Sequence, residues 1–246
     1  MNILIGCEVS GVIRNAYRER GYNAWSCDLQ PADDKSPYHF YGDVKGVVDP
    51  LTGIHESRYG KWRWDLGIFH PECRYLSNSG VHCLVGKNKS DEYKRDRWQK
   101  MVDAALFFKW CLDLNIEKIC VENPVIHGYA KKIIGRGPDQ TIQPYDFGEN
   151  ASKRTCYWLK GLPPLIGTEY FPPEYGCKYC LIKFDLSLGK YGCPGCGADF
   201  GPAKYVWGNQ TPSGQNKLGP SSDRAKKRAE TYPGVAKAKA IQWGVL

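Results

Sequence analysis

Two pairs of cysteines lie close together in the last third of the chain, each with two residues between its members. The pairs are Cys177 with Cys180 and Cys193 with Cys196, and twelve residues separate them. Four thiolates at this spacing are typical of a structural zinc ribbon, because each short turn can direct two sulfurs at one ion. Two unrelated cysteine pairs, or two redox motifs, are the alternatives. The spacing favours zinc, and we expect a ribbon insert at 169–202 that organises a small fold and takes no part in catalysis.

The composition of the whole chain is that of a protein with one sizeable core. It has 246 residues in all, 42% hydrophobic content and no apolar run long enough to span a bilayer. The first residues indicate a buried strand rather than a signal peptide, and the other seven cysteines lack the spacing of a disulfide framework. We therefore expect a cytoplasmic protein whose main domain comprises residues 1–168 with 203–246.

The formal net charge is +8, and this basic surplus fits a polyanionic partner. Soluble proteins that bind no nucleic acid can carry a surplus of the same size. Lysines are dense near the C-terminus, at Lys217, Lys226, Lys227, Lys237 and Lys239.

The N-terminal segment has the pattern of a strand, a turn, a helix and a second strand. These segments are a strand at 3–5, a turn at 6–11, a helix at 12–20 and a strand at 24–27. Ser10 is suited to cap the helix, Gly21 to end it, and Asp28 follows the second strand. In nucleoside-binding α/β folds an acid at this position binds ribose hydroxyls. The alternative is an ordinary βαβ unit in which Asp28 is a solvated strand end.

The remaining apolar segments alternate between strand and helix patterns. Strands are predicted at 41–44, 65–69, 116–121 and 157–159, a helix at 90–114, and one or two helices over 224–243 divided at 232–234. The long helix carries an apolar stripe typical of a core: Trp98, Met101, Val102, Ala105, Phe108 and Leu112. Such alternation predicts an α/β fold, with a parallel sheet covered by helices on both faces.

Reactive side chains follow the ends of the predicted strands, where open α/β sheets bind ligands. Cys73 comes after a proline, and a cationic neighbour such as His70 or Arg74 would favour its thiolate. Cys73 as a small core residue is the alternative. Glu122 also follows a strand, where a glutamate is often a solvated or capping group. Arg154, preceding the strand at 157–159, is by default a surface charge.

Taken together, these residues resemble the cytosine-5 DNA methyltransferase family, and most closely its compact phage and prophage members. Pro71-Glu72-Cys73 resembles the Pro-Pro-Cys nucleophile motif, with Glu72 where the family has proline. Glu122-Asn123-Pro124 resembles the Glu-Asn-Val motif, and the segment ending at Arg154 resembles the one whose arginines steady the target base. The resemblance implies contacts to S-adenosylmethionine from Gly6, Cys7, Glu8, Ser10, Gly11, Asp28, Asp43 and Pro71.

The resemblance implies a Rossmann-like, S-adenosylmethionine-dependent methyltransferase fold with a small inserted zinc ribbon. It also implies a catalytic set of Cys73, Glu122 and Arg154, acting on a cytosine flipped out of duplex DNA in a bacterial or phage-infected cell. The family's large target-recognition domain is missing here. A transferase of the same fold acting on RNA, on a free nucleotide or with another transferred group remains open, as does a non-catalytic zinc-ribbon protein that binds nucleic acid.

Overall fold

The computed structural model describes residues 1–86, 89–177, 179–184, 192–198, 204–211, 216–221 and 223–245. These residues form two compact units. The first comprises residues 1–142, 154–165 and 239–246, and the second comprises residues 143–153 and 166–238. The predicted ribbon insert at 169–202 lies in the second unit, with 178, 185–191 and 199–202 outside the described residues. The predicted domain bounds stay a prediction.

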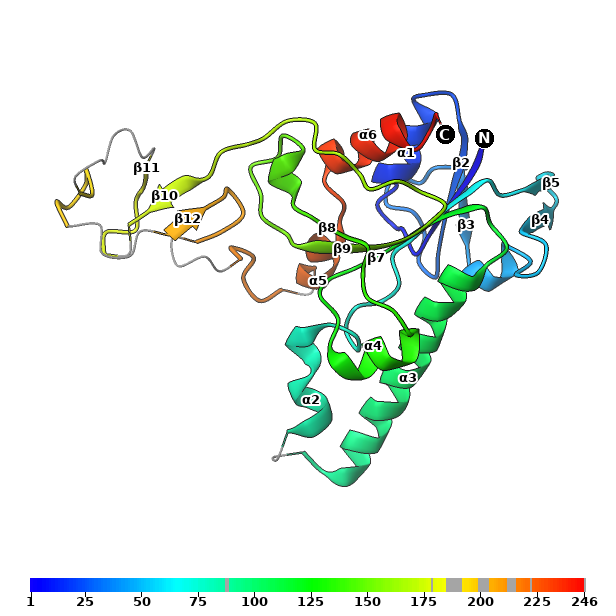
Figure 1. The fold of residues 1–246 in the computed structure, drawn as a ribbon, viewed down its shortest axis with the longest axis horizontal. Coiled ribbons are helices and arrows are strands. Elements are labelled where there is room, and N and C mark those ends of the chain that lie inside the picture. The colour runs from blue at the N-terminus through cyan, green and yellow to red at the C-terminus, as the bar shows by residue number, and fades with distance from the viewer. Residues whose placement is uncertain are drawn as a thin grey trace. The chain divides into compact units, whose positions relative to one another are not determined.

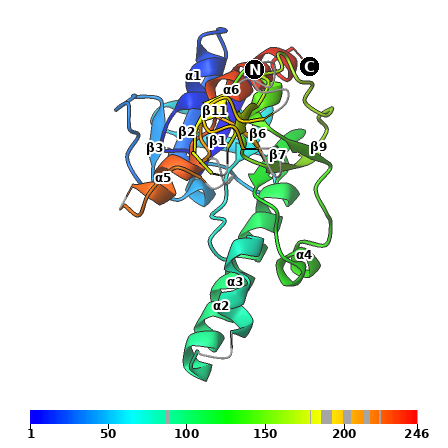
Figure 2. The ribbon, with the colours of Figure 1, turned by 90° about the vertical axis from the view of Figure 1, so that its left-hand side faces the viewer.

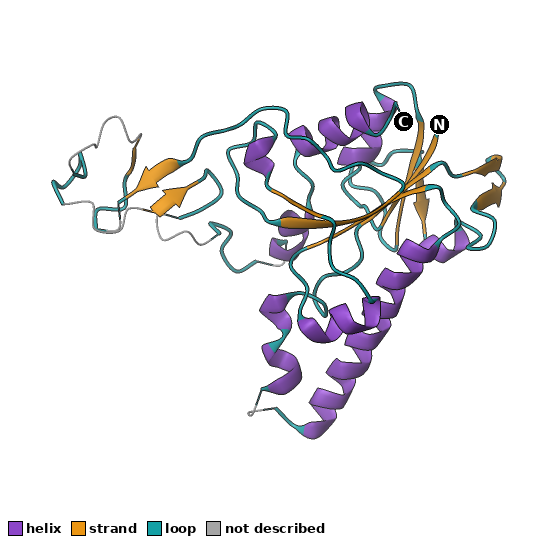
Figure 3. Cartoon of the chain, in the orientation of Figure 1, coloured by secondary structure: helices purple, strands orange, loops and turns teal. Residues whose placement is uncertain are grey.

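A seven-stranded sheet organises the first unit (Figures 1 and 3). Its strands run in the order β3-β2-β1-β6-β7-β9-β8. The bounds are β1 (Asn2–Gly6), β2 (Asn23–Asp28), β3 (His39–Tyr41), β6 (Leu66–Phe69), β7 (Lys118–Asn123), β8 (Gln140–Ile142) and β9 (Thr155–Lys160). The first five strands of this order are parallel, whereas β9 pairs antiparallel with both β7 and β8. The predicted α/β class is confirmed, and the expectation of a wholly parallel sheet is wrong at β9.

Helices and short turns connect these strands. Their bounds are α1 (Val12–Arg18), η1 (Val44–Gly46), η2 (Asn78–Gly80), α2 (His82–Val85), α3 (Asp91–Asp113) and α4 (Gly128–Ile134). A small hairpin of β4 (Ile54–Ser57) and β5 (Gly60–Arg63) stands apart from the large sheet (Figure 3). Both α2 and α4 lie alongside α3 (Figures 1 and 2). Among the residues described, no helix combines the length and apolar character needed to cross a bilayer.

The long helix α3 matches its prediction and supplies much of the core. It begins after Ser90, whose hydroxyl accepts the backbone N–H of Tyr93 at 3.2 Å, as an N-cap should. The predicted stripe faces the sheet, and its members Met101, Ala105 and Phe108 are almost fully buried. They pack with residues of the large sheet in one apolar cluster. Burial on both faces explains why the sheet strands are apolar throughout rather than alternating.

Three local predictions need correction. The first helix ends at Arg18 rather than at Arg20, and Glu8 accepts the N–H groups of Ile13 and Arg14, while Ser10 accepts only that of Val12 at 3.4 Å. The predicted strand at 41–44 ends at Tyr41, because Asp43 caps η1 by accepting the N–H of Lys45. The sequence alone does not decide which residue caps a helix, because acidic side chains and serines serve equally well as caps.

The second unit contains a three-stranded sheet of order β11-β10-β12. The described elements of the second unit are β10 (Glu174–Gly176), β11 (Lys183–Phe184), β12 (Lys204–Val206), η3 (Pro144–Asp146) and α5 (Arg224–Ala229). The last helix, α6 (Pro233–Gln242), belongs to both units, with Lys239 onward in the first. The sequence therefore predicted correctly that the C-terminal helical segment is divided near Pro233.

Candidate functional site

The sheet of the first unit reverses its order between β1 and β6. From β1 the order runs to β2 and β3 on one side, and from β6 to β7 on the other. Ligands of open α/β sheets bind at such a switch point, outside the carboxyl ends of the strands. The loops after β1, β2, β3, β6 and β7 all leave the sheet at this edge, which we call the carboxyl edge.

The loop after β1 is a tight turn built around Glu8. The Glu8 carboxylate accepts the N–H of Ile13 at 2.8 Å and that of Arg14 at 3.3 Å, at the start of α1. Burial raises the pKa of this carboxyl. Ser10 accepts the N–H of Val12 at 3.4 Å. Two residues predicted to contact a cofactor thus also hold the turn itself in shape.

Two glycines of this turn are required by close packing. A Cβ at Gly6 would lie 2.4 Å from a ring carbon of Phe69, which is fully buried. Gly11 has a φ of +71°, and a Cβ there would lie 2.2 Å from the guanidinium of Arg14. The backbone at both positions can therefore follow this path only without a side chain.

The ends of β2 and β3 bring further predicted residues next to this turn. The carbonyl of Cys27 accepts the N–H groups of Cys7 and Glu8, and that of Asp28 accepts the N–H of Gly42. The Asp28 side chain accepts the N–H of Gln30 at 2.9 Å, and burial raises its pKa. Burial, followed by the charges of Asp28 and Asp43, raises the pKa of the Cys7 thiol. The predicted cofactor residues of β1, β2 and β3 therefore gather at one end of the sheet.

The loop after β6 carries the predicted nucleophile. Pro71 is buried, and its carbonyl accepts the side-chain amide of Asn123 at 2.9 Å. Cys73 is exposed, and its carbonyl accepts the N–H groups of Leu76 and Ser77, which closes a turn. Beside it, Glu72 and Arg74 pair at 3.2 Å. The proline and the amide contact fix the base of the loop, while Cys73 lies in its exposed part.

A buried ion cluster forms around Glu122 at the end of β7. His70 Nε2 lies 2.8 Å from Oε1 of Glu122, and the ammonium of Lys239 pairs with the same oxygen. Glu122 is 7% exposed and Lys239 is fully buried. Burial alone would raise the pKa of Glu122, but the charges of Lys239 and His70 outweigh it and lower the pKa to about 2. Glu122 is therefore a carboxylate at neutral pH, able to accept a hydrogen bond.

Arg154 reaches the same edge because β9 runs antiparallel. Asn123 at the end of β7 pairs with Cys156 near the start of β9, so Arg154 lies just beyond the end of β7. Its side chain is exposed. A parallel strand would have placed this arginine at the opposite edge, so the reversal of β9 brings it to the side of Cys73 and Glu122.

Sequence reasoning missed Lys239 as a site residue and counted it among the basic surface lysines. A signal for burial was present. Val235, Lys239 and Trp243 are spaced by four residues, so a helix places the lysine on the same face as two large apolar side chains. His70 was considered only as a partner for Cys73, although it directly follows the apolar strand that neighbours β7.

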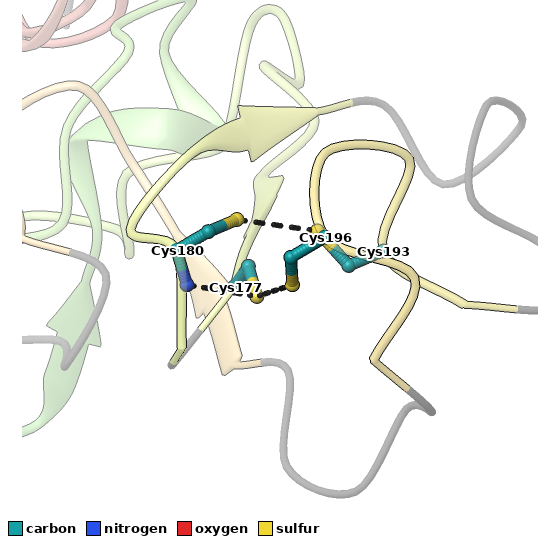
Figure 4. Close-up of side chains that lie close together, drawn as sticks. All are labelled: Cys177, Cys180, Cys193 and Cys196. Carbon is teal, nitrogen blue, oxygen red and sulfur yellow. Dashed lines mark hydrogen bonds between the residues drawn. The ribbon is translucent and has the colours of Figure 1, made fainter.

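A second candidate site lies in the other unit, where four cysteine sulfurs converge (Figure 4). The sulfurs of Cys177, Cys180, Cys193 and Cys196 all lie within 4.8 Å of one another. Two of the separations are 3.7 Å, between Cys177 and Cys196, and 3.4 Å, between Cys180 and Cys193. Sulfurs bound tetrahedrally at about 2.3 Å from zinc stand about 3.8 Å apart. The set fits one zinc ion.

The two cysteine turns have the same backbone geometry. In the first, Cys177 N–H donates to the carbonyl of Ile182, and Leu181 N–H donates to the carbonyl of Cys177. In the second, Cys193 and Gly197 make the same two bonds, with Ala198 in the place of Ile182. Leu181 and Gly197 both have positive φ, at 62° and 70°. Two copies of one turn thus present two sulfurs each.

Backbone amides support thiolate character in this cluster. The N–H of Cys180 points at the sulfur of Cys177 at 3.5 Å, and the N–H of Gly195 points at the sulfur of Cys193 at 3.4 Å. The first of these contacts is the main cause that lowers the pKa of Cys177 to about 6. Four cysteine sulfurs this close together are the donor set of a closed structural zinc site, in which the ligands bind as thiolates.

Two solved structures are similar to this chain at low sequence identity. One is a proposed DNA modification methyltransferase encoded within a prophage of E. coli, with 12% identity over 70% of this chain and 53% of that protein and a TM-score of 0.40. The other is the methyltransferase EhMeth of Entamoeba histolytica, with 13% identity over 70% of this chain and 58% of that protein and a TM-score of 0.43. The chain spans little more than half the length of either protein. No protein-family model matches the sequence, and the comparison with curated proteins finds no match.

Proposed function

We propose that this chain is an S-adenosylmethionine-dependent DNA methyltransferase that acts on carbon 5 of cytosine. The observation that carries the proposal is the contact between His70 and Glu122 at the carboxyl edge, with the exposed Cys73 three residues after His70. A thiol and a carboxylate on adjacent strand ends are the two groups that addition to a pyrimidine ring requires.

The residues of this edge have distinct proposed roles. The Cys73 thiolate adds to carbon 6 of a flipped cytosine, which makes carbon 5 nucleophilic. Ring nitrogen 3 takes up a proton from solvent during this addition, the Glu122 carboxylate accepts a hydrogen bond from the resulting N–H, and Arg154 steadies the ring. When carbon 5 has received the methyl group it loses its proton to solvent, the bond between sulfur and carbon 6 breaks, and Cys73 leaves as a thiolate. Ring nitrogen 3 then returns its proton to solvent, which gives the neutral methylated base.

The cofactor would occupy the other half of the edge. Bound S-adenosylmethionine supplies an electrophilic methyl group. The turn at 6–11 and Pro71 would face it, Asp28 would accept hydrogen bonds from the ribose hydroxyls, and Asp43 would contact the adenine. The Asp28 side chain is only partly buried at the end of β2, which suits such contacts.

Transfer of tritium from labelled S-adenosylmethionine to duplex DNA tests this function. Wild-type protein should label DNA, Cys73→Ala should not, and Cys83→Ala, a cysteine of α2, should retain labelling. Duplex DNA with 5-fluorocytosine should trap a covalent complex that survives denaturation, because fluorine cannot leave carbon 5 as the proton does. Label found only in RNA or in free nucleotide would favour the other transferase readings, and DNA binding without label would favour the non-catalytic one.

A further inference from the structure

Lys239 is a fully buried lysine in the middle of α6. Its helix carries a second lysine, Lys237, which is exposed. An ammonium group is seldom buried completely, because removing it from water costs several kcal/mol unless an anion replaces the lost hydration. The position of Lys239 therefore calls for an explanation from the groups that surround it.

The ammonium of Lys239 has two partners. It pairs with Oε1 of Glu122 and lies 4.8 Å from the centre of the Tyr157 ring. His70 contacts the same oxygen. Within the part of the chain that the structure describes, no residue donates to Oε2 of Glu122. The two contacts thus occupy one oxygen of the carboxylate and leave the second for a ligand.

Three residues next to Glu122 carry unpaired buried polar atoms. Among the described residues, His70 Nδ1, Asn123 Oδ1 and the Tyr157 hydroxyl are buried without a hydrogen-bond partner. His70 contacts Glu122, Asn123 follows it, and Tyr157 is its register partner across the sheet. Buried polar atoms are rarely left unpaired, so three together indicate a site that bound molecules complete.

The charge of Lys239 decides which form Glu122 takes. A buried glutamate without a cation takes up a proton and becomes a donor, whereas one paired with an ammonium stays a carboxylate and can only accept. Of the two cations that act on it, Lys239 has the larger effect and does not depend on protonation of an imidazole. The other titratable groups that face Glu122 are Tyr17 on α1, Cys120 on β7 and Tyr157 on β9.

We propose that Lys239 is a positioning residue for Glu122. Its ammonium holds Oε1 and keeps the carboxylate ionised, so that Oε2 is the acceptor presented to the N–H edge of the substrate base. This inference rests on the proposed function for the identity of the substrate, but the effect of Lys239 on the ionisation of Glu122 can be measured without any substrate.

The first test follows the ionisation of Glu122 by carbon-13 NMR of the glutamate carboxyls, with the signal assigned through Glu122→Gln. Glu122 should remain ionised at pH 4 in the wild type and in Lys237→Met, the matched variant on the same helix. In Lys239→Met its titration should move upwards by about 1 to 3 pH units, the usual effect of one close opposite charge. Lys239→Arg should restore the wild-type titration.

The second test is the pH profile of methyl transfer. In Lys239→Met the acid limb of the kcat profile should shift to higher pH together with the Glu122 titration, while in Lys239→Arg it should lie close to its wild-type pH. A variant that merely folded less well would lose amplitude without a shift of the limb. Wild-type protein that transfers no methyl group would refute the proposed function, and the NMR titration would still decide the role of Lys239.

Two results would overturn the inference. One is a wild-type Glu122 that titrates at the ordinary value of exposed glutamates, and the other is a titration that Lys239→Met leaves unchanged. If Lys239→Met does not fold, the wild-type titration and that of Lys239→Arg decide the question, since the arginine retains the charge.

Discussion

His70 Nε2 lies 2.8 Å from Oε1 of Glu122, across the ends of two adjacent parallel strands. The contact follows from the register of the two strands. Phe69 pairs with Val121, and the residues that follow these two in the chain are His70 and Glu122. Lys239 approaches the same oxygen from a helix more than a hundred residues later in the chain. A local consequence of sheet geometry thus becomes a three-residue cluster around one carboxylate oxygen through tertiary packing.

We predict that Glu122→Gln destabilises the protein most near neutral pH. The change leaves Lys239 buried without its anion, which should cost about 3–5 kcal/mol at pH 7. The pKa of Glu122 falls from 4.5 to about 2 on folding, so its ionisation contributes stability above pH 4.5 that is lost as the pH falls through 2. Urea denaturation should therefore show a smaller difference in the free energy of unfolding between wild type and Glu122→Gln at pH 3 than at pH 7.

Glu117→Gln is the matched control, because Glu117 is an exposed glutamate next to β7. It should change the free energy of unfolding by less than about 0.5 kcal/mol at either pH. Parallel stability curves for wild type and Glu122→Gln between pH 7 and pH 3 would mean that the pKa of Glu122 does not fall on folding.

The carboxyl edge could be predicted largely from the sequence, whereas its charge cluster could not. Gly6, Asp28, Cys73 and Glu122 each follow a short apolar run, and strands that alternate with helices bring such positions to one edge. Lys239 belongs to a helix whose contact with β7 depends on the packing of the whole unit. Its spacing from Val235 and Trp243 indicates burial, but the pattern cannot identify the anion that it meets.

The direction of β9 was also beyond the sequence pattern. An apolar run such as Cys156–Leu159 has the same composition whichever way the strand runs, so hydrophobic pattern alone gives no polarity. The short elements β8 and α4 escaped prediction because runs of three and seven residues carry little periodic signal. The reversed strand affects the site through Arg154, which it brings to the carboxyl edge, and through Tyr157, which it pairs with Glu122.

We predict that Gly6→Ala destabilises the protein by about 1–3 kcal/mol, the usual cost of overpacking a buried position. The added methyl group would lie 2.4 Å from the ring of Phe69, which is buried in the sheet and cannot move aside. Denaturant unfolding would measure the loss. Gly128→Ala is the control, since nothing lies within 4 Å of its Cβ position at the start of α4, and it should be neutral or slightly stabilising.

Equal stability of Gly6→Ala and wild type would mean that Phe69 can repack. In that case a contact with the cofactor, rather than packing, would be the reason for glycine at the end of β1. Binding of S-adenosylmethionine to both proteins would then separate the two explanations.

We predict about one zinc ion per chain in the purified protein. The four sulfurs are already arranged for one ion, and thiolates packed this closely repel one another once it is removed. Elemental analysis should detect the zinc in wild type and in Cys83→Ser, and should find it lost in Cys193→Ser. Hydrogen exchange should show the amides of β10 and β11 losing protection when a chelator removes the metal. A metal-free chain with these amides still protected would contradict the assignment.

The two cysteine turns allow a sharper prediction, because one of them carries strain that the other avoids. Leu181 and Gly197 occupy equivalent positions with positive φ, and a side chain there costs about 1 kcal/mol relative to glycine. The side chain of Leu181 is largely exposed, so its removal sacrifices little packing. Leu181→Gly should therefore tighten zinc binding about fivefold in a competition with a chromogenic chelator, and Gly197→Leu should weaken it by a similar factor. If Leu181→Gly weakened binding instead, the leucine would have to stabilise the ribbon through its side chain, and the equivalence of the two turns would not extend to their energies.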